Sequence, residues 1–207
     1  MKLIVFGASG KTGNEIVKLA LAQGHKVTAF VRDPSSMVLK NNNLDYFTGD
    51  VFDLASVERA IKGHDAVVCA LGAGNDLKKT TVRTTGTINI IKSMKKNKVK
   101  RLMVMSAMGV GNSWDSLSLL NKIFFATLLK SSREDHESQE TAVIESGLEW
   151  TIIRPSGLID TPRTGVYKAG ENITAVTSKI ARADIADLIL KELKQNVLIG
   201  KAVTITN

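Results

Sequence analysis

Short apolar runs rich in β-branched residues alternate along the chain with segments whose apolar positions recur every three or four residues. The first pattern predicts strands and the second predicts amphipathic helices. The predicted strands are residues 2–6, 26–31, 44–48, 65–71, 101–106, 149–154 and 201–206, and the predicted helices are residues 12–22, 54–62, 80–96, 133–146 and 182–193. This regular alternation predicts an α/β fold, a single-domain Rossmann-type doubly wound parallel sheet.

Local signals support several of these boundaries. The run 66–71 is continuously apolar, as expected of a parallel strand covered by helices on both faces. Asp53 is placed to cap the start of helix 54–62, and Gly147 is placed to end helix 133–146. Pro155 is expected to end the strand before it.

Two segments depart from the alternation. Residues 114–130 carry apolar side chains on more than one helical stripe, which predicts a helix buried against the sheet or, alternatively, a pocket lining or an oligomer contact. Residues 156–171 are rich in Gly, Thr and Pro, which predicts a functional loop. We therefore expect one domain over residues 1–207, with substrate-side segments at about 107–132 and 155–175.

A GxxGxxG motif, GASGKTG at residues 7–13, directly follows the first predicted strand and opens a helix. The first glycine permits the tight turn, the second lets the backbone approach a pyrophosphate, and the third lets the helix pack on the strand. Unpaired amides at the helix start would bind the phosphates, so the motif predicts dinucleotide binding. The predicted phosphate-loop residues are Gly7, Ser9, Gly10, Lys11, Thr12 and Gly13.

The end of the second predicted strand decides between the two nicotinamide dinucleotides, because an acidic residue there binds the ribose 2′-hydroxyl and a basic residue binds a 2′-phosphate. Arg32 stands at this position, and its planar guanidinium suits a phosphate. Asp33 follows and could instead hold the hydroxyl or pair with Arg32. With Lys11 as a second nearby cation, the sequence favours NADPH over NADH.

Composition narrows the class of protein. The 207 residues are 43% hydrophobic and 23% charged, which excludes disordered and fibrous proteins. The apolar runs are far too short for a membrane span, and a single cysteine, Cys69, predicts a reducing, cytoplasmic location and a buried core position. The net charge of +8 favours anionic partners. The basic run Lys92, Lys95, Lys96, Lys98, Lys100 and Arg101 lacks interleaved aromatic residues, so we expect a solvated helix end and no nucleic-acid partner.

Taken together, these residues resemble the atypical short-chain dehydrogenases/reductases, and within them the flavin reductase or biliverdin reductase B type. The resemblance implies that Asp50 and Val51 lie near the adenine, that Leu71 and Gly72 lie near the ribose and pyrophosphate, and that Ser106 lies near the nicotinamide. Besides the glycine motif, the matching stretches are 31–33 (VRD), 49–51 (GDV), 71–72 (LG), 75–77 (NDL), 106–107 (SA), 135–136 (DH), 145–148 (ESGL) and 164–167 (TGVY).

The catalytic dyad of ordinary members of that superfamily is missing. They use a Tyr with a Lys four residues later to deliver a proton to an alkoxide. Neither Tyr46 nor Tyr167 has such a lysine, and the usual positions fall on about Ser132 and His136. A simple ketone or alcohol is therefore disfavoured, whereas a conjugated acceptor spreads the incoming electrons and can take its proton from water.

Ser106 remains as the candidate catalytic residue, a hydrogen-bond donor at the carboxyl end of a strand, with capping of the backbone as its alternative role. His136 could relay a proton, but we expect a histidine on the helix surface paired with Asp135 or Glu140. Arg154 with Pro155 is expected to be a structural pair. No cluster has the spacing of metal ligands, so no metal is predicted.

The sequence thus predicts an NADPH-dependent reductase that transfers hydride to a planar conjugated acceptor. The expected acceptor is flavin-like or biliverdin-like, with a quinone as a further candidate. The alternative is a regulatory protein similar to nitrogen-metabolite repressors (NmrA-like), which senses NAD(P) without turnover. A sugar-nucleotide epimerase is disfavoured by the short chain and the absent tyrosine. The expected partner is a small molecule, with no nucleic acid and no membrane, and the expected assembly is a monomer or small homo-oligomer.

Overall fold

The computed structural model describes residues 1–72, 81–111, 130–171, 173 and 179–207. An eight-stranded sheet forms its centre, in the order β3-β2-β1-β4-β5-β6-β10-β8. The first seven strands of this order are parallel and β8 is antiparallel to β10. The strands of this sheet are β1 (Lys2–Phe6), β2 (Lys26–Val31), β3 (Leu44–Thr48), β4 (Ala66–Cys69), β5 (Arg101–Met105), β6 (Glu149–Pro155), β8 (Lys168–Gly170) and β10 (Lys201–Thr206). The order reverses direction between β1 and β4, so the predicted Rossmann-type doubly wound sheet is confirmed.

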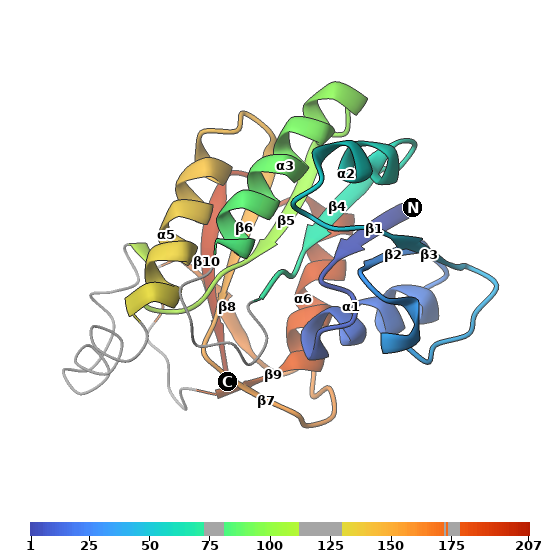
Figure 1. Cartoon of the computed structure of the whole chain (residues 1–207). Helices are drawn as coiled ribbons and strands as arrows, with labels where there is room; N and C mark the ends of the chain where they lie inside the picture. Colours follow the sequence, from blue (N-terminus) through green and yellow to red (C-terminus); the bar gives the residue numbers. More distant parts are fainter. Residues whose placement is uncertain (73–80, 112–129, 172, 174–178) are drawn as a thin grey trace.

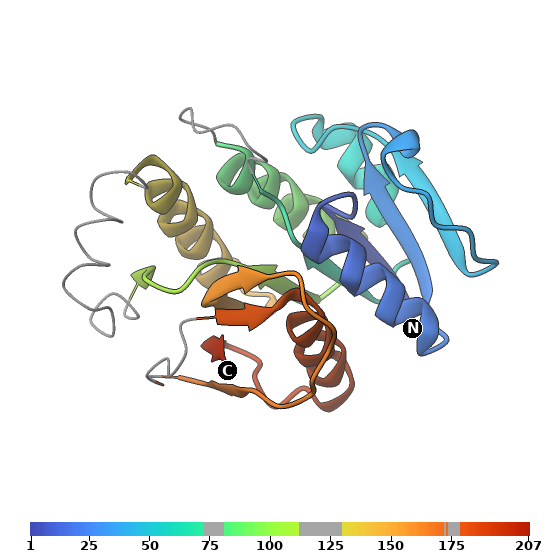
Figure 2. The same cartoon turned by 90° about the horizontal axis from the view of Figure 1, so that it is seen from below.

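Helices cover both faces of the sheet (Figures 1 and 2). Helices α2, α3 and α5 lie on one face, and α1 and α6 pack side by side on the other. The described helices are α1 (Lys11–Ala22), α2 (Leu54–Ile61), α3 (Val82–Asn97), α5 (Lys130–Ile144) and α6 (Arg182–Gln195), with a short 3-10 helix at Pro34–Ser36. Each parallel strand is followed by a chain that returns over one face, which brings the carboxyl ends of the strands to one edge.

Two apolar cores follow from this layering. One lies under α1 and α6 and includes Val5, Ile16 and Ile189, all fully buried. The other lies under α2, α3 and α5 and includes Phe6 and Ile90. Strand β4 contributes Val68 to the first core and Val67 to the second, which explains why this strand is continuously apolar in the sequence.

The boundary signals in the sequence have the expected structural roles. The side chain of Asp53 accepts a hydrogen bond from the amide of Ala55 and caps α2. Gly147 follows α5 with a φ of 68°, the left-handed conformation that favours glycine after a helix. Pro155 is the last residue of β6.

The predicted loop at residues 156–171 is partly wrong. It contains β7 (Gly157–Ile159), which pairs in parallel with β9 (Lys179–Ala181), and also β8, which extends the main sheet. These strands are three residues long and pair with segments far away in the sequence, so no local pattern marks them. The apolar segment 114–130 lies outside the described residues except for Lys130, which begins α5.

Candidate functional site

The turn that leaves β1 can only be built from glycine at two positions. Gly7 has a φ of 77°, and a Cβ there would lie 2.3 Å from the carbonyl oxygen of Ala70 at the end of β4. A Cβ on Gly13 would lie 2.1 Å from the carbonyl oxygen of Gly7. Since both neighbours are backbone, neither can yield, and the first turn of α1 is held tightly against the ends of β1 and β4.

Gly10 has a different role from these two glycines. It precedes α1 with ordinary extended backbone, and a Cβ there would meet only the Gly7 oxygen, at 3.2 Å. The N-cap residue of α1 is Gly10 itself, which has no side chain to cap the helix, and the first turn carries no acidic residue. Ser9, Gly10 and Lys11 are exposed, whereas Thr12 and Gly13 are buried. The helix start therefore offers backbone amides and a positive dipole end to an anion, which fits a pyrophosphate.

The end of β2 separates the two residues on which the choice of cofactor depends. Asp33 caps the short 3-10 helix, and its two carboxylate oxygens accept hydrogen bonds from the amide and hydroxyl of Ser35, at 2.9 and 2.7 Å. These bonds lower the pKa of Asp33. Arg32 is exposed, and within the described residues its guanidinium forms no ion pair or hydrogen bond. The basic side chain is thus available to a ligand and the acidic one is engaged.

The residues expected near the adenine and ribose lie together at the ends of β3 and β4. Asn89 of α3 donates a hydrogen bond to the carbonyl oxygen of Val51 at 2.8 Å and so fixes the turn after β3. A Cβ on Gly86 would lie 2.6 Å from the Leu71 side chain and 3.1 Å from Val51, so these two apolar side chains meet over α3. Asp50 and Gly72 are exposed beside them.

Ser106 and His136 meet at the end of β5, two strands away from the glycine turn. Both are buried, and the Ser106 Oγ lies 3.4 Å from Nδ1 of His136 on α5. The prediction that His136 lies on the helix surface is wrong. Its presumed partners are engaged elsewhere, because Asp135 accepts hydrogen bonds from Thr84 and pairs with Arg83, and Glu140 pairs with Arg154. The structure therefore places an imidazole, and not a lysine, beside Ser106.

The electrostatic setting keeps His136 neutral. Burial, and next the nearby Arg83 guanidinium, lower the pKa of His136 to about 3, although Asp135 acts in the opposite direction. A neutral imidazole can accept a hydrogen bond from the Ser106 hydroxyl or donate one to it, depending on its tautomer. It does not carry a titratable proton near neutral pH.

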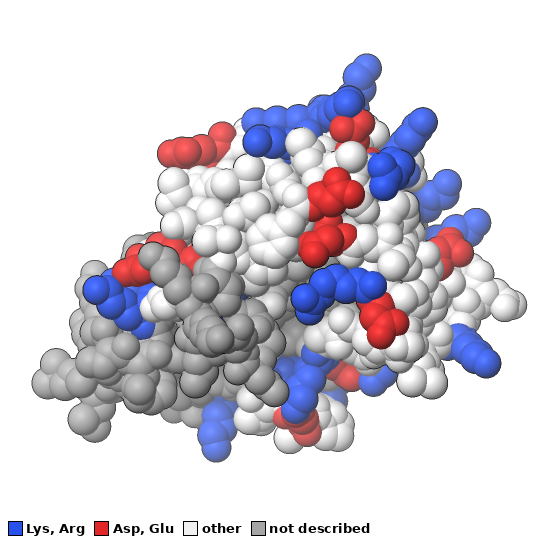
Figure 3. Space-filling view, viewed as in Figure 1, with Lys and Arg blue, Asp and Glu red and all other residues white. Residues whose placement is uncertain are grey.

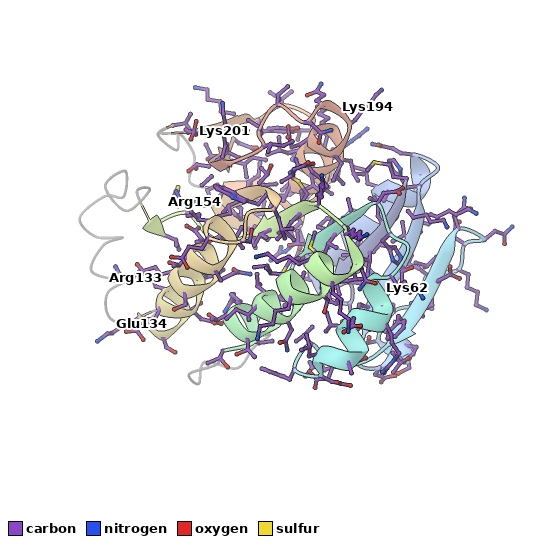
Figure 4. The ribbon with its side chains drawn as sticks, turned by 90° about the horizontal axis from the view of Figure 1, so that it is seen from above. Lys62, Arg133, Glu134, Arg154, Lys194 and Lys201 are labelled. Carbon is purple, nitrogen blue, oxygen red and sulfur yellow. The ribbon has the colours of Figure 1, made fainter. Side chains whose placement is uncertain are left out.

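The other residues singled out in the sequence are structural. Arg154 forms a two-pronged pair with Glu140, at 2.9 and 2.6 Å, and lies between β6 and α5 (Figure 4). Cys69 is buried in contact with Thr87 and Gln139, and burial raises the pKa of its thiol, so its predicted core position is confirmed. Tyr167 donates to Asp187 at 2.8 Å on α6, and burial and this carboxylate raise its pKa to about 12.

Sequence reasoning missed an ionic cluster beside the glycine turn. Asp160, just after β7, accepts hydrogen bonds from Lys11 of α1 and Arg182 of α6. It also missed Ser156, a buried residue directly after β6 whose hydroxyl has no hydrogen-bond partner among the residues that the structure describes. The only signal for either was their location in the segment 155–175, which the sequence assigns to the substrate side.

Charged side chains elsewhere are distributed as a solvated surface. Lys92, Lys95, Lys96 and Lys98 are exposed near the end of α3, at the top of the space-filling view (Figure 3). Arg101 does not belong to this surface, because it is buried and pairs with Glu192 at 2.9 Å. Within the described ranges, no three His, Cys, Asp or Glu side chains gather as metal ligands, and no helix could cross a membrane.

Comparison with known proteins agrees with this geometry. A family model described as NAD(P)H-binding matches residues 7–196, which includes the glycine turn and every described strand except the first, β1, and the last, β10. The chain belongs to the NAD(P)H-binding family. One similar protein is the uncharacterized protein YwnB of Bacillus subtilis, which is 32% identical to this chain over 204 residues. The alignment covers 94% of this chain and 92% of YwnB.

Solved structures show that this family member shares its fold with short-chain dehydrogenases/reductases. ChuY of Escherichia coli O157:H7, described as an anaerobillin reductase, superposes with a TM-score of 0.83 at 24% identity, covering 100% of this chain and 97% of ChuY. A wide-type short-chain dehydrogenase/reductase of Veillonella parvula, in complex with NADP, gives 0.82 at 15% identity, with coverage of 100% and 94%. The resemblance stated from the sequence is confirmed at the level of the family and the fold.

Proposed function

We propose that the protein is an NADPH-dependent reductase that passes hydride to a planar, conjugated acceptor such as a flavin or an open-chain tetrapyrrole. The observation that carries this proposal is the combination of an uncapped helix start at the glycine turn with a buried Ser106–His136 pair two strands away. The first fits a dinucleotide and the second fits a site that orients reactants more than it titrates. The E. coli relative in fold described as an anaerobillin reductase supports an acceptor of this class.

Different residues would bind the different parts of the dinucleotide and the acceptor. The amides that begin α1 would hold the pyrophosphate, with Gly10 allowing its approach, and Val51 with Leu71 would offer an apolar surface to the adenine. When bound, the dinucleotide supplies the hydride. Ser106 would donate a hydrogen bond to the acceptor or engage the carboxamide, held in place by His136.

Among the described residues, the side chain that contacts the Ser106 hydroxyl is the neutral His136, and this favours one kind of acceptor. His136 is neutral near pH 7, so the pair lacks the acid that a simple ketone needs for its developing alkoxide. Tyr167 has Lys191 near its hydroxyl, at 3.4 Å, but Asp187 binds both groups and the tyrosine pKa is raised, which disfavours proton transfer. A conjugated ring system, which delocalises the added electrons and takes its proton from water, suits such a site.

NADPH, as opposed to NADH, is proposed from the two residues after β2. Arg32 is exposed and available to a 2′-phosphate, whereas both oxygens of Asp33 are bonded to Ser35 and are poorly placed to accept from a 2′-hydroxyl. Replacing Arg32 by Gln should weaken NADPH binding about ten-fold and leave NADH binding within about two-fold, as measured by calorimetry. Equal losses for both cofactors would contradict the assignment.

The function is tested by following NADPH oxidation with FMN, riboflavin, biliverdin and quinones as acceptors. We expect turnover with at least one of them, and a rate at least about ten-fold lower for Ser106→Ala. Ser93 is a buried serine in the carboxyl half of α3, so Ser93→Ala is the matched control and should leave the rate unchanged. Tight NADPH binding without turnover on the whole panel would favour the NmrA-like sensor, and absence of binding would refute both.

A further inference from the structure

One exposed carboxylate connects the two helices that cover the same face of the sheet. The Oδ2 of Asp160 lies 2.6 Å from Nζ of Lys11, and its Oδ1 accepts a hydrogen bond from Nη1 of Arg182. Lys11 is the first residue of α1 and Arg182 is the first residue of α6. Two cations from segments far apart in the sequence therefore converge on one anion beside the glycine turn.

The position of this cluster links it to the phosphate loop. Lys11 directly follows Gly10, and helices α1 and α6 pack side by side with their starts at the carboxyl edge of the sheet (Figure 2). At neither helix start does the side chain of the N-cap residue, Gly10 or Ala181, accept a hydrogen bond from a backbone amide. An anion at the start of α1 would thus meet the Lys11 ammonium. The Arg182 guanidinium is close to this ammonium, because the single carboxylate of Asp160 contacts both groups.

Asp160 is not needed to hold its own segment in place. Thr164 and Gly165 are bonded to the buried carboxylate of Asp184, and β7 pairs with β9 over three residues. Asp160 itself is 55% exposed, and the Lys11 ammonium holds the pKa of its carboxyl below the usual range. Its carboxylate can therefore separate from the cations and enter water at little cost, while the segment keeps its anchors.

We propose that Lys11 and Arg182 bind the pyrophosphate of the dinucleotide, and that Asp160 is an internal anion that competes with the pyrophosphate for these two cations. The inference rests on the proposed dinucleotide function and adds Arg182 and Asp160 to the residues that set affinity. The side chain of Lys11 is 72% exposed and that of Arg182 is 17% exposed, so the first can move to a ligand and the second is held ready. Competition of this kind lowers cofactor affinity and speeds exchange of the oxidised for the reduced form.

The test is calorimetric titration of the whole protein with NADPH and with NADH. Because both carry the same pyrophosphate, Asp160→Asn should tighten the binding of both by a similar factor, about three-fold to ten-fold. Lys11→Met and Arg182→Met should each weaken both cofactors, and the gain from Asp160→Asn should shrink when it is combined with either. Glu171→Gln is the matched control. The side chain of Glu171 is 51% exposed like that of Asp160, and its carboxylate lies 3.9 Å from the Lys201 ammonium, whereas neither Lys11 nor Arg182 pairs with it.

The outcomes separate this inference from the proposed function. If the unaltered protein binds neither cofactor, both fail together. If it binds them but Asp160→Asn leaves the affinity unchanged or weakens it, only the competition fails. A gain confined to NADPH, or an equal gain in Glu171→Gln, would also overturn it, because the first indicates the 2′-phosphate and the second a general charge effect. If Asp160→Asn does not fold, unchanged affinity in Lys11→Met and Arg182→Met overturns the proposal.

Discussion

His136 shows how a buried polar side chain can be stable and still unsuited to acid catalysis. His136 is 8% exposed and lies beside Ser106. Burial lowers the pKa of its imidazole to about 3. Unfolding exposes the ring and restores its ordinary pKa of 6.5. Below that value the unfolded chain takes up a proton that the folded chain does not, so the contribution of this group to stability is lost as pH falls.

Replacing His136 by Asn should remove this dependence while keeping a polar atom near the place of Nδ1. We expect the variant to be less stable at pH 7, and the difference in free energy of unfolding from the parent to narrow by about 2 kcal/mol between pH 7 and pH 5. Chemical denaturation at several pH values measures it. His25 and His64, whose pKa values are also lowered, are common to both proteins and cancel in the difference. A constant difference would mean that His136 has the same pKa in the folded and the unfolded chain, and so that burial does not lower it.

The sequence places Ser106 correctly at the end of a strand but misplaces His136, and the cause lies in the composition of α5. Helix positions that are buried are normally recognised because they are apolar. The buried face of α5 is instead polar, with Asp135, Gln139 and Glu140 bonded to partners on α3 and β6, so the helix has the sequence pattern of a solvated one. Such a face is stable only because most of its polar groups meet partners on neighbouring elements, which no single-helix pattern can predict.

Among the elements, the glycine turn combines two requirements that substitution can separate. The Cβ of alanine at Gly13 would collide with the Gly7 carbonyl at 2.1 Å, whereas at Gly10 it would meet that oxygen at 3.2 Å and otherwise face solvent. The third glycine therefore serves the packing of α1 on β1, and the second leaves room for a ligand.

Gly13→Ala should consequently destabilise the protein by about 2 kcal/mol or more, because the backbone has to shift. Gly10→Ala should change stability by less than about 1 kcal/mol and yet weaken NADPH binding by at least about ten-fold, since its methyl group occupies the path of the pyrophosphate. Thermal unfolding and calorimetry on the two variants provide the measurements. Full NADPH affinity in Gly10→Ala would contradict the assignment of the phosphate site.

Elements that depend on interactions between neighbours in the sequence are predicted well, and elements that depend on contacts between distant segments are not. Strands and helices of the parallel core form where local periodicity, Asp53 and Gly147 mark them, and their boundaries agree with the sequence to within a few residues. The segment after Pro155 is ordered by long-range contacts, with β7 on β9 and Thr164 on Asp184. Because these contacts depend on the finished fold, the sequence pattern there reads as a loop.

At the scale of the whole molecule, stability is concentrated at the centre of the sheet. Strands β1, β4, β5 and β6 lie between two cores, and all residues of β4 and β5 are buried. Strand β3 at one edge and β8 at the other are partly exposed. Backbone amides at the centre can exchange only through large-scale opening, whereas the edges can open alone.

Hydrogen exchange followed by mass spectrometry should resolve this gradient. We expect amides of β1, β4 and β5 to exchange at least about 100-fold more slowly than those of β8, because each step in opening free energy of about 1.4 kcal/mol changes the rate ten-fold. Addition of NADPH should then slow exchange most in the glycine turn, where the amides of Lys11 and Thr12 at the start of α1 would become donors to phosphate. Slowing restricted to the end of α3, where exposed lysines gather, would instead place the anion on that basic surface and remove the dinucleotide from the glycine turn.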